Sequence, residues 1–301
     1  MENAQETHVE TGNLVGIIPV SGRNDHDFQM PWPDCLTPIA PDYTLIESSV
    51  VECAYAGCKA IYIVINDDTA PIVRKRIGDF CGDPVWSDRT CDPIPHESKR
   101  RIPIFYIPLH AKDRGRRDSL SWSVIHGALT AFKLSSGISR WFSPSKYYVS
   151  FPHSYFDPSQ IRSSRRLISG PKNFYLSYNG ETVKDGHFLS FTFTKDEWIK
   201  FRRIVRTGTG IRPPGSKFGD TAKLPPKERY SARWFDVDKV FAPLELGEMN
   251  ELEIEGFYNI RSWKEYINML AGTMDNTPIC PKESVLYAYG HNKVAIDTEE
   301  K

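Results

Sequence analysis

Unbroken apolar runs recur through the first half of the chain, and they predict strands that are buried on both faces. Four runs of this kind stand at residues 14–20, 60–65, 102–108 and 147–151. Strands inside a parallel sheet have this continuous apolar character, because helices cover both of their faces. Each run therefore predicts one strand of a mostly parallel sheet.

Apolar residues at helical spacing fill two of the intervals between these runs. They lie in residues 43–56 and 118–134, and the first stretch is followed by Gly57, a typical residue for a helix end. The polar triplet 66–68 predicts the start of another helix, which we expect to end near Phe80. Strands that alternate with helices in this way predict right-handed parallel units.

The pattern changes in the second half of the chain. Residues 173–194 alternate in character around Asn179-Gly180 and Asp185-Gly186, which is typical of an antiparallel hairpin. Four further elements are expected: helices at 198–205 and 263–270, a long loop at 206–229 and a strand at 234–240. We therefore predict an α/β protein, a Rossmann-like three-layer α/β/α sandwich with a mostly parallel central sheet and a small antiparallel sub-sheet.

The composition fits one globular domain without a charged partner. Of 301 residues, 40% are hydrophobic, and we expect a domain at 13–290 between a disordered start at 1–12 and a tail at 291–301. The 38 basic and 38 acidic residues cancel, so no overall field attracts nucleic acid or an anionic membrane. No apolar run approaches the ~20 residues of a membrane span. We expect a cytoplasmic protein, and a homo-oligomer is compatible with the sequence.

The six cysteines include no Cys-x-x-Cys pair. Cys53 and Cys58 stand in apolar surroundings and are expected to be core residues of a reducing compartment. Cys81 and Cys91 share a polar loop where a zinc pair is an alternative, although the spacing of cysteine and histidine there does not match a standard four-ligand site.

The loop after the first predicted strand is the first place to look for chemistry, because ligands of open α/β sheets bind beyond the carboxyl ends of the strands. Val20-Ser21-Gly22-Arg23 stands there. The glycine lets the backbone approach a phosphate, and the arginine can pair with phosphate oxygens. A plain turn with a solvated arginine is the alternative. His153 follows the fourth strand and could be a metal ligand, a general base or a surface residue.

Several short motifs, taken in order, resemble those of the sugar-1-phosphate nucleotidyltransferases. They are Gly22-Arg23, Pro33 to Ile39, Leu45-Ile46-Glu47, Ala56-Gly57 and Ile61 to Asn66. Later, Arg233 to Asp238 resembles the family's Trp-x-Asp motif, and Ile279 to Glu283 resembles its C-terminal Cys-Pro-Glu-Glu segment. The likeness extends over most of the chain and is densest in residues 14–68.

The resemblance implies a reaction and a set of site residues. In that family a sugar 1-phosphate attacks the α-phosphorus of a nucleoside triphosphate, with Mg²⁺ as cofactor, and a nucleotide-sugar and pyrophosphate result. By this likeness, residues 13–160 form the nucleotide-binding half and residues 161–290 the sugar or acceptor half. The implied catalytic residues are Arg23 and Asp236, and the implied metal ligands are Asp236, Asp238 and His153. The implied nucleotide-binding residues are Val20, Ser21, Gly22, Arg23, Asp118 and Ser119.

Two departures from the family pattern affect the chemistry. Asp34 stands where the family has a lysine that neutralises the α-phosphate, which places an anion beside a polyphosphate. Pro152-His153 replaces the family's Gly-Asp metal motif, and imidazole is a poor ligand for Mg²⁺. Three hypotheses follow. The first is an active nucleotidyltransferase. The others are a catalytically silent relative that binds a nucleotide or a protein, and a glycosyltransferase with Asp236-Val237-Asp238 as its metal motif.

Overall fold

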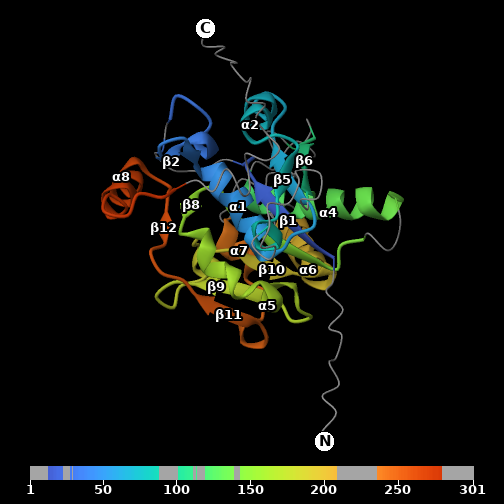
Figure 1. Cartoon of the computed structure of the whole chain (residues 1–301). Helices are drawn as coiled ribbons and strands as arrows, with labels where there is room; N and C mark the ends of the chain where they lie inside the picture. The colour runs from blue at the N-terminus through green and yellow to red at the C-terminus, as the bar shows by residue number, and fades with distance from the viewer. Residues whose placement is uncertain are drawn as a thin grey trace, which may run out of the picture.

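The structure is a computed structural model that describes residues 13–22, 28, 30–87, 101–110, 113, 119–138, 143–208 and 236–279. The predicted termini at 1–12 and 291–301, and nearly all of the predicted loop at 206–229, lie outside the described residues. Figure 1 shows a central sheet with helices packed around it.

Eight strands form the central sheet. In spatial order they are β11 (Asn250–Glu253), β9 (Phe174–Ser177), β10 (Phe191–Phe193), β7 (Lys146–Val149), β1 (Leu14–Pro19), β4 (Ile61–Ile65), β6 (Arg101–Pro108) and β5 (Phe80–Gly82). The strands that the unbroken apolar runs predict are β1, β4, β6 and β7, and they pair in parallel at the centre. β10 runs antiparallel to both of its neighbours, and β5 runs antiparallel to β6. The predicted mostly parallel sheet is confirmed.

Helices cover both faces of this sheet, because successive side chains of one strand enter two different apolar clusters. Leu14 and Ile18 of β1 belong to one cluster, whereas Val15 and Ile17 belong to the other. The helices on the first face are α1 (Leu45–Ala56), α2 (Ala70–Ile77) and α5 (Arg165–Ser169); those on the second face are α4 (Leu120–Ile138), α6 (Lys195–Gly208) and α7 (Val237–Phe241). A short helix, α3 (Pro84–Ser87), follows β5. This arrangement is the predicted three-layer sandwich.

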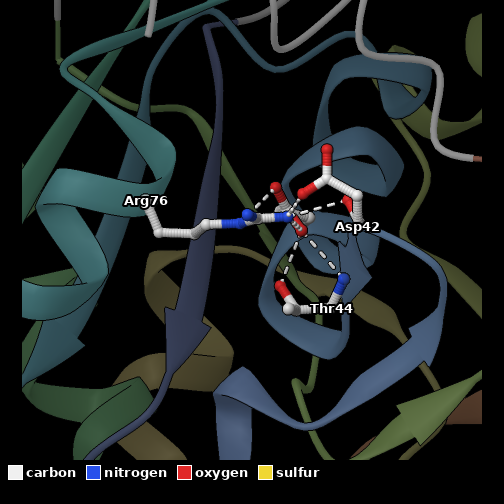
Figure 2. A network of polar contacts seen from close by, with 4 residues as sticks. Asp42, Thr44 and Arg76 are labelled. Carbon is white, nitrogen blue, oxygen red and sulfur yellow. Dashed lines mark hydrogen bonds and ion pairs between the residues drawn. The ribbon is translucent and has the colours of Figure 1, made fainter. Parts of the chain in front are cut away.

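A network of polar contacts fixes the start of α1, as Figure 2 shows. The Glu47 carboxylate accepts hydrogen bonds from the backbone N–H and the hydroxyl of Thr44, both at 2.8 Å, which makes a capping box. Arg76, near the end of α2, pairs with Glu47 at 2.9 Å and with Asp42 at 2.8 Å. α1 starts at Leu45, later than predicted, because the preceding residues form β3 (Tyr43–Thr44), which pairs with β2 (Pro38–Ala40).

Two elements differ clearly from the prediction. α2 ends at Ile77 rather than near Phe80, because Phe80 begins the edge strand β5, which pairs with β6. The strand predicted at 234–240 is wrong, since the described part of this segment contains α7. Val237, Val240 and Phe241 are buried at helical spacing, and Asp236 is the N-cap residue. The error arises because only three apolar residues mark the buried face of α7. So few apolar residues also fit the pattern of a short strand.

The antiparallel part of the fold agrees with the prediction. β9 pairs with β10, and the Asn179-Gly180 turn adopts positive φ at both residues, 51° and 78°. A separate ribbon is formed by β8 (Ser154–Tyr155) and β12 (Tyr258–Asn259), and it leads into α8 (Trp263–Gly272). α8 packs against the β2–β3 segment, where Tyr266 and Met269 join Ile39 and Tyr43 in a third apolar cluster.

Candidate functional site

The carboxyl edge of the sheet has its switch point at β1. This strand lies between β4 and β7, and all three are parallel, so their carboxyl ends share one edge. The chain leaves β1 through Val20 and Ser21, whose N–H groups both donate to the carbonyl oxygen of Val64, at 2.9 and 2.8 Å. These bonds lay the loop over the end of β4 and fix where Gly22 lies.

Gly22 packs directly on the start of α4. Its φ is +144°, and an added Cβ would lie 2.5 Å from the backbone nitrogen of Leu120. For both reasons, no residue other than glycine fits at position 22 unless the backbone around it moves. The Ser123 hydroxyl also donates to the carbonyl oxygen of Ser21, so the loop and the first turn of α4 form one unit. The contact with α4 is a steric reason for glycine that the sequence does not contain, and the predicted approach to a phosphate stays a prediction.

The first turn of α4 has the features of an anion site. α4 is 19 residues long, and the first N–H groups of an α-helix have no partner within the helix. Ser119 caps it, because its hydroxyl accepts from the N–H of Trp122 at 3.3 Å. The buried hydroxyl oxygens of Ser21 and Ser121 have no hydrogen-bond partner among the described residues. We call this arrangement of Ser21, Gly22 and the first turn of α4 the β1–α4 cradle.

Four of the predicted nucleotide-binding residues are brought together at the β1–α4 cradle, namely Val20, Ser21, Gly22 and Ser119. The other two, Arg23 and Asp118, lie outside the described residues. A role of these residues in nucleotide binding stays a prediction.

A second group of side chains gathers on the other side of β1, beyond the carboxyl end of β7 and the start of β10. The guanidinium carbon of Arg261 lies 4.4 Å from the ring centroid of Phe188, and the ring of His153 lies 5.9 Å from the same centroid. His153 is only 4% exposed, so the alternative of a surface histidine is wrong. The carbonyl oxygen of His153 accepts from the N–H of Ile260 at 2.8 Å, which holds Arg261 next to it. We call these residues the Arg261 cluster.

Arg261 is a cation that its surroundings stabilise incompletely. Burial lowers the pKa of Arg261, and the carboxylates of Glu265, Asp236 and Asp238 act in the opposite direction. Its buried Nε atom has no hydrogen-bond partner among the described residues. A half-buried guanidinium placed on an aromatic face is suited to bind a phosphate or carboxylate.

The predicted metal ligands do not form a metal site in the described part of the structure. Asp236 is exposed, and its carboxylate pairs with Lys239 at 2.8 Å. Asp238 lies near Arg261, since both approach Gly186. No three acidic, histidine or cysteine side chains among the described residues are close enough together to hold a metal ion. His153, Asp236 and Asp238 thus share one neighbourhood but do not fit Mg²⁺ in this arrangement.

Beneath the Arg261 cluster lies a buried carboxylate that the sequence analysis missed. Glu52, on α1, accepts hydrogen bonds from the hydroxyls of Tyr148 (2.6 Å), Ser150 (2.6 Å) and Ser190. Burial raises the pKa of Glu52 to about 7, and the three hydroxyl donors reduce the shift. Ser150 follows β7 and Ser190 precedes β10. Glu52 therefore joins the two segments that carry His153 and Phe188.

Asp34, which replaces the family's lysine, begins a short 3₁₀ turn (Asp34–Leu36). Burial raises the pKa of Asp34, so its negative charge is less favourable in the folded protein than in water.

Little in the sequence indicates the members of the Arg261 cluster. Arg261 stands just before Ser262, the N-cap of α8, and its own N–H donates to Glu265 at 2.8 Å. That context is typical of a structural cap. Phe188 looks like any core aromatic residue, and only the tertiary contact relates it to Arg261.

Comparison with known proteins shows the fold of the chain. No family model matches its sequence, and no curated protein does either. Among solved structures, the chain is similar to a protein from Bacillus anthracis described as a glucose-1-phosphate thymidylyltransferase in complex with sucrose. The TM-score is 0.52 at 9% identity, over 86% of this chain and 94% of the other. It is also similar to a UDP-glucose pyrophosphorylase in complex with UDP-glucose, with a TM-score of 0.47, 12% identity and coverage of 87% and 98%.

At such low identity, the first of these likenesses shows the fold and nothing finer. It confirms the predicted α/β fold class. In the described part of the chain, no helix combines the length and apolar character that a membrane span requires.

Proposed function

We propose that the protein is a nucleotidyltransferase-like enzyme that transfers a nucleotidyl group from a nucleoside triphosphate to a sugar 1-phosphate. The observation that carries the proposal is the presence of two separate groups of hydrogen-bond donors, suited to anions, on opposite sides of β1. The β1–α4 cradle offers helix N–H groups and free hydroxyls on one side. The Arg261 cluster offers a half-buried guanidinium on the other. A reaction between two phosphorylated substrates needs two such features.

In the proposed reaction, an oxygen of the sugar phosphate forms a bond to the α-phosphorus of the triphosphate. The bond between that phosphorus and the bridging oxygen breaks, and pyrophosphate leaves with the electron pair. The β1–α4 cradle would hold the triphosphate, together with Arg23, and Arg261 would orient the sugar phosphate. Positioning of two anions against fixed donors supplies most of the catalysis in such transfers. No three acidic, histidine or cysteine side chains among the described residues lie close enough together to hold Mg²⁺.

The proposal can be tested by incubating the protein with each of the four nucleoside triphosphates and a panel of sugar 1-phosphates, with Mg²⁺ or Mn²⁺, and measuring pyrophosphate. We expect release with at least one pair. A matched reaction with Gly22→Ala should release none, because the added Cβ meets the Leu120 nitrogen. The proposal is contradicted if no pair of substrates releases pyrophosphate and no triphosphate raises the melting temperature.

One observation favours a second candidate, a catalytically silent relative that binds a nucleotide. Asp34 and Pro152-His153 replace two functional motifs of the family, and the predicted metal ligands do not form a site among the described residues. Under this reading, a triphosphate raises the melting temperature while no pyrophosphate appears with any acceptor. The same two measurements therefore separate the candidates.

A further inference from the structure

The helix α8 lies at the periphery of the molecule (Figure 1), and it carries an exposed apolar stripe. The stripe consists of Trp263 (53% exposed), Ile267 (48%), Leu270 (36%) and Met274 (76%), the last in the turn that follows the helix. The adjoining face of the helix, with Tyr266 and Met269, is buried against the protein. Four large exposed side chains at spacings of four, three and four residues make a continuous patch of the kind that marks protein interfaces.

The spacings of four, three and four residues along the stripe are the same when α8 is followed from either end. If a second α8 lies antiparallel about a two-fold axis between Ile267 and Leu270, each Ile267 meets the Leu270 of the other copy. Each Trp263 then meets the other copy's Met274. A patch that is complementary to itself under a two-fold rotation is what a symmetric dimer requires.

A hollow beside one end of the stripe provides the matching surface. A cavity of about 440 Å³ lies between α8 and the β2–β3 segment, and it is lined by Leu270, Met274, Ile39 and Pro41 among others. Trp263 projects at the other end of the same helix. The antiparallel arrangement brings the indole of Trp263 in each copy to the hollow of the other copy. The two-fold symmetry makes this contact twice in one dimer. Aromatic side chains that fill apolar pockets are the usual anchors of protein interfaces.

The charges next to the stripe agree with the same arrangement. Lys264 is exposed at the start of α8, and Asp275 is exposed just beyond its end. Antiparallel pairing brings the lysine of one copy to the aspartate end of the other, whereas parallel pairing would bring equal charges together. This complementarity favours a second copy of the chain over an unrelated partner.

We propose that two copies of this protein form a symmetric dimer through antiparallel packing of their α8 stripes, with each Trp263 in the hollow of the other copy. The stripe is a small patch compared with the ~1,200–2,000 Å² that stable interfaces bury, so the dimer is reversible and concentration-dependent. The proposal is independent of the proposed nucleotidyl transfer.

Sedimentation velocity of the full chain, from about 1 µM to about 100 µM, tests the proposal, and a shift from monomer to dimer within that range is expected. Trp263→Glu should raise the dissociation constant at least about tenfold, since it removes an interface anchor. The control is Ile199→Glu, which changes a similarly exposed residue (50%) on α6. Circular dichroism of each variant checks that the fold is kept.

A charge exchange tests the register itself. Lys264→Glu alone should weaken the dimer because it faces an aspartate, and the pair Lys264→Glu with Asp275→Lys should restore it. A chain that stays monomeric at the highest concentration overturns the proposal. So does a dimer that Trp263→Glu leaves intact, because that dimer must use another surface.

Discussion

The two sides of the switch point are built from different parts of the polypeptide. The β1–α4 cradle is a backbone structure: a glycine at φ +144° lies on the first turn of a 19-residue helix. The Arg261 cluster is a side-chain structure, in which residues from three distant segments meet around Phe188. A backbone site depends on local chain geometry, whereas a side-chain site depends on how whole elements dock. Substitutions on the two sides should therefore have different effects on stability and on ligand binding.

The largest effect is expected at the backbone side. Gly22→Ala combines an unfavourable φ with a 2.5 Å approach to the Leu120 nitrogen, and it should lower the free energy of unfolding by about 2–4 kcal/mol. Triphosphate binding should be lost. Gly180→Ala is the matched control, because Gly180 also has a positive φ, +78°, but an added Cβ meets nothing within 4 Å. Urea unfolding measures both variants, and equal losses would show that the contact with α4 is unimportant.

The buried carboxylate beneath the side-chain side gives the next effect. The pKa of Glu52 is about 7 in the folded protein against an ordinary 4.5, so between these values the folded state holds a proton that the unfolded chain has released. The free energy of unfolding should therefore fall as pH rises from 4.5 to 7, by up to roughly 3 kcal/mol. Glu52→Gln should remove this slope, and Glu253→Gln on the exposed face of β11 should keep it. A slope unchanged in Glu52→Gln would contradict the assignment.

Removal of the guanidinium tests the side-chain side directly. Arg261→Met should weaken sugar 1-phosphate binding about tenfold or more, because a charge-assisted contact to phosphate is lost, while triphosphate binding stays within about twofold. Isothermal titration with each ligand separates the two effects. Arg203→Met, at an exposed position of α6, is the control. A variant that loses both ligands equally would mean that the two sides are not independent.

The smallest effect on stability is expected at Asp236. Its ion pair with Lys239 is exposed on both partners, so Asp236→Asn should change the free energy of unfolding by less than about 0.5 kcal/mol. Its effect on turnover is the sharper measurement. If the carboxylate holds a metal during the reaction, pyrophosphate release should be abolished in a normally folded variant. Unchanged release would remove Asp236 from the proposed catalytic residues.

The sequence by itself determined the centre of the fold. The strands β1, β4, β6 and β7 follow from unbroken apolar runs, since only strands covered on both faces can tolerate them. The end of α1 follows from Gly57, whose φ of +90° confirms the predicted cap. The approximate place of the site follows as well, because parallel strands fix which edge carries the loops after Pro19 and Val149. These features depend on neighbours in the chain and on regular periodicity.

Only the tertiary structure decided the composition of the site. Arg261 and Phe188 are 73 positions apart, and Glu52 contacts Ser190 across 138 positions. Packing of α1 on one face of the sheet and pairing of β12 with β8 bring them together, and no local pattern records it. The strand predicted at 234–240 failed for the same reason, since burial against β10 and α6 selects the helix α7. Residue type limits what each side chain can do, but packing decides which side chains act together.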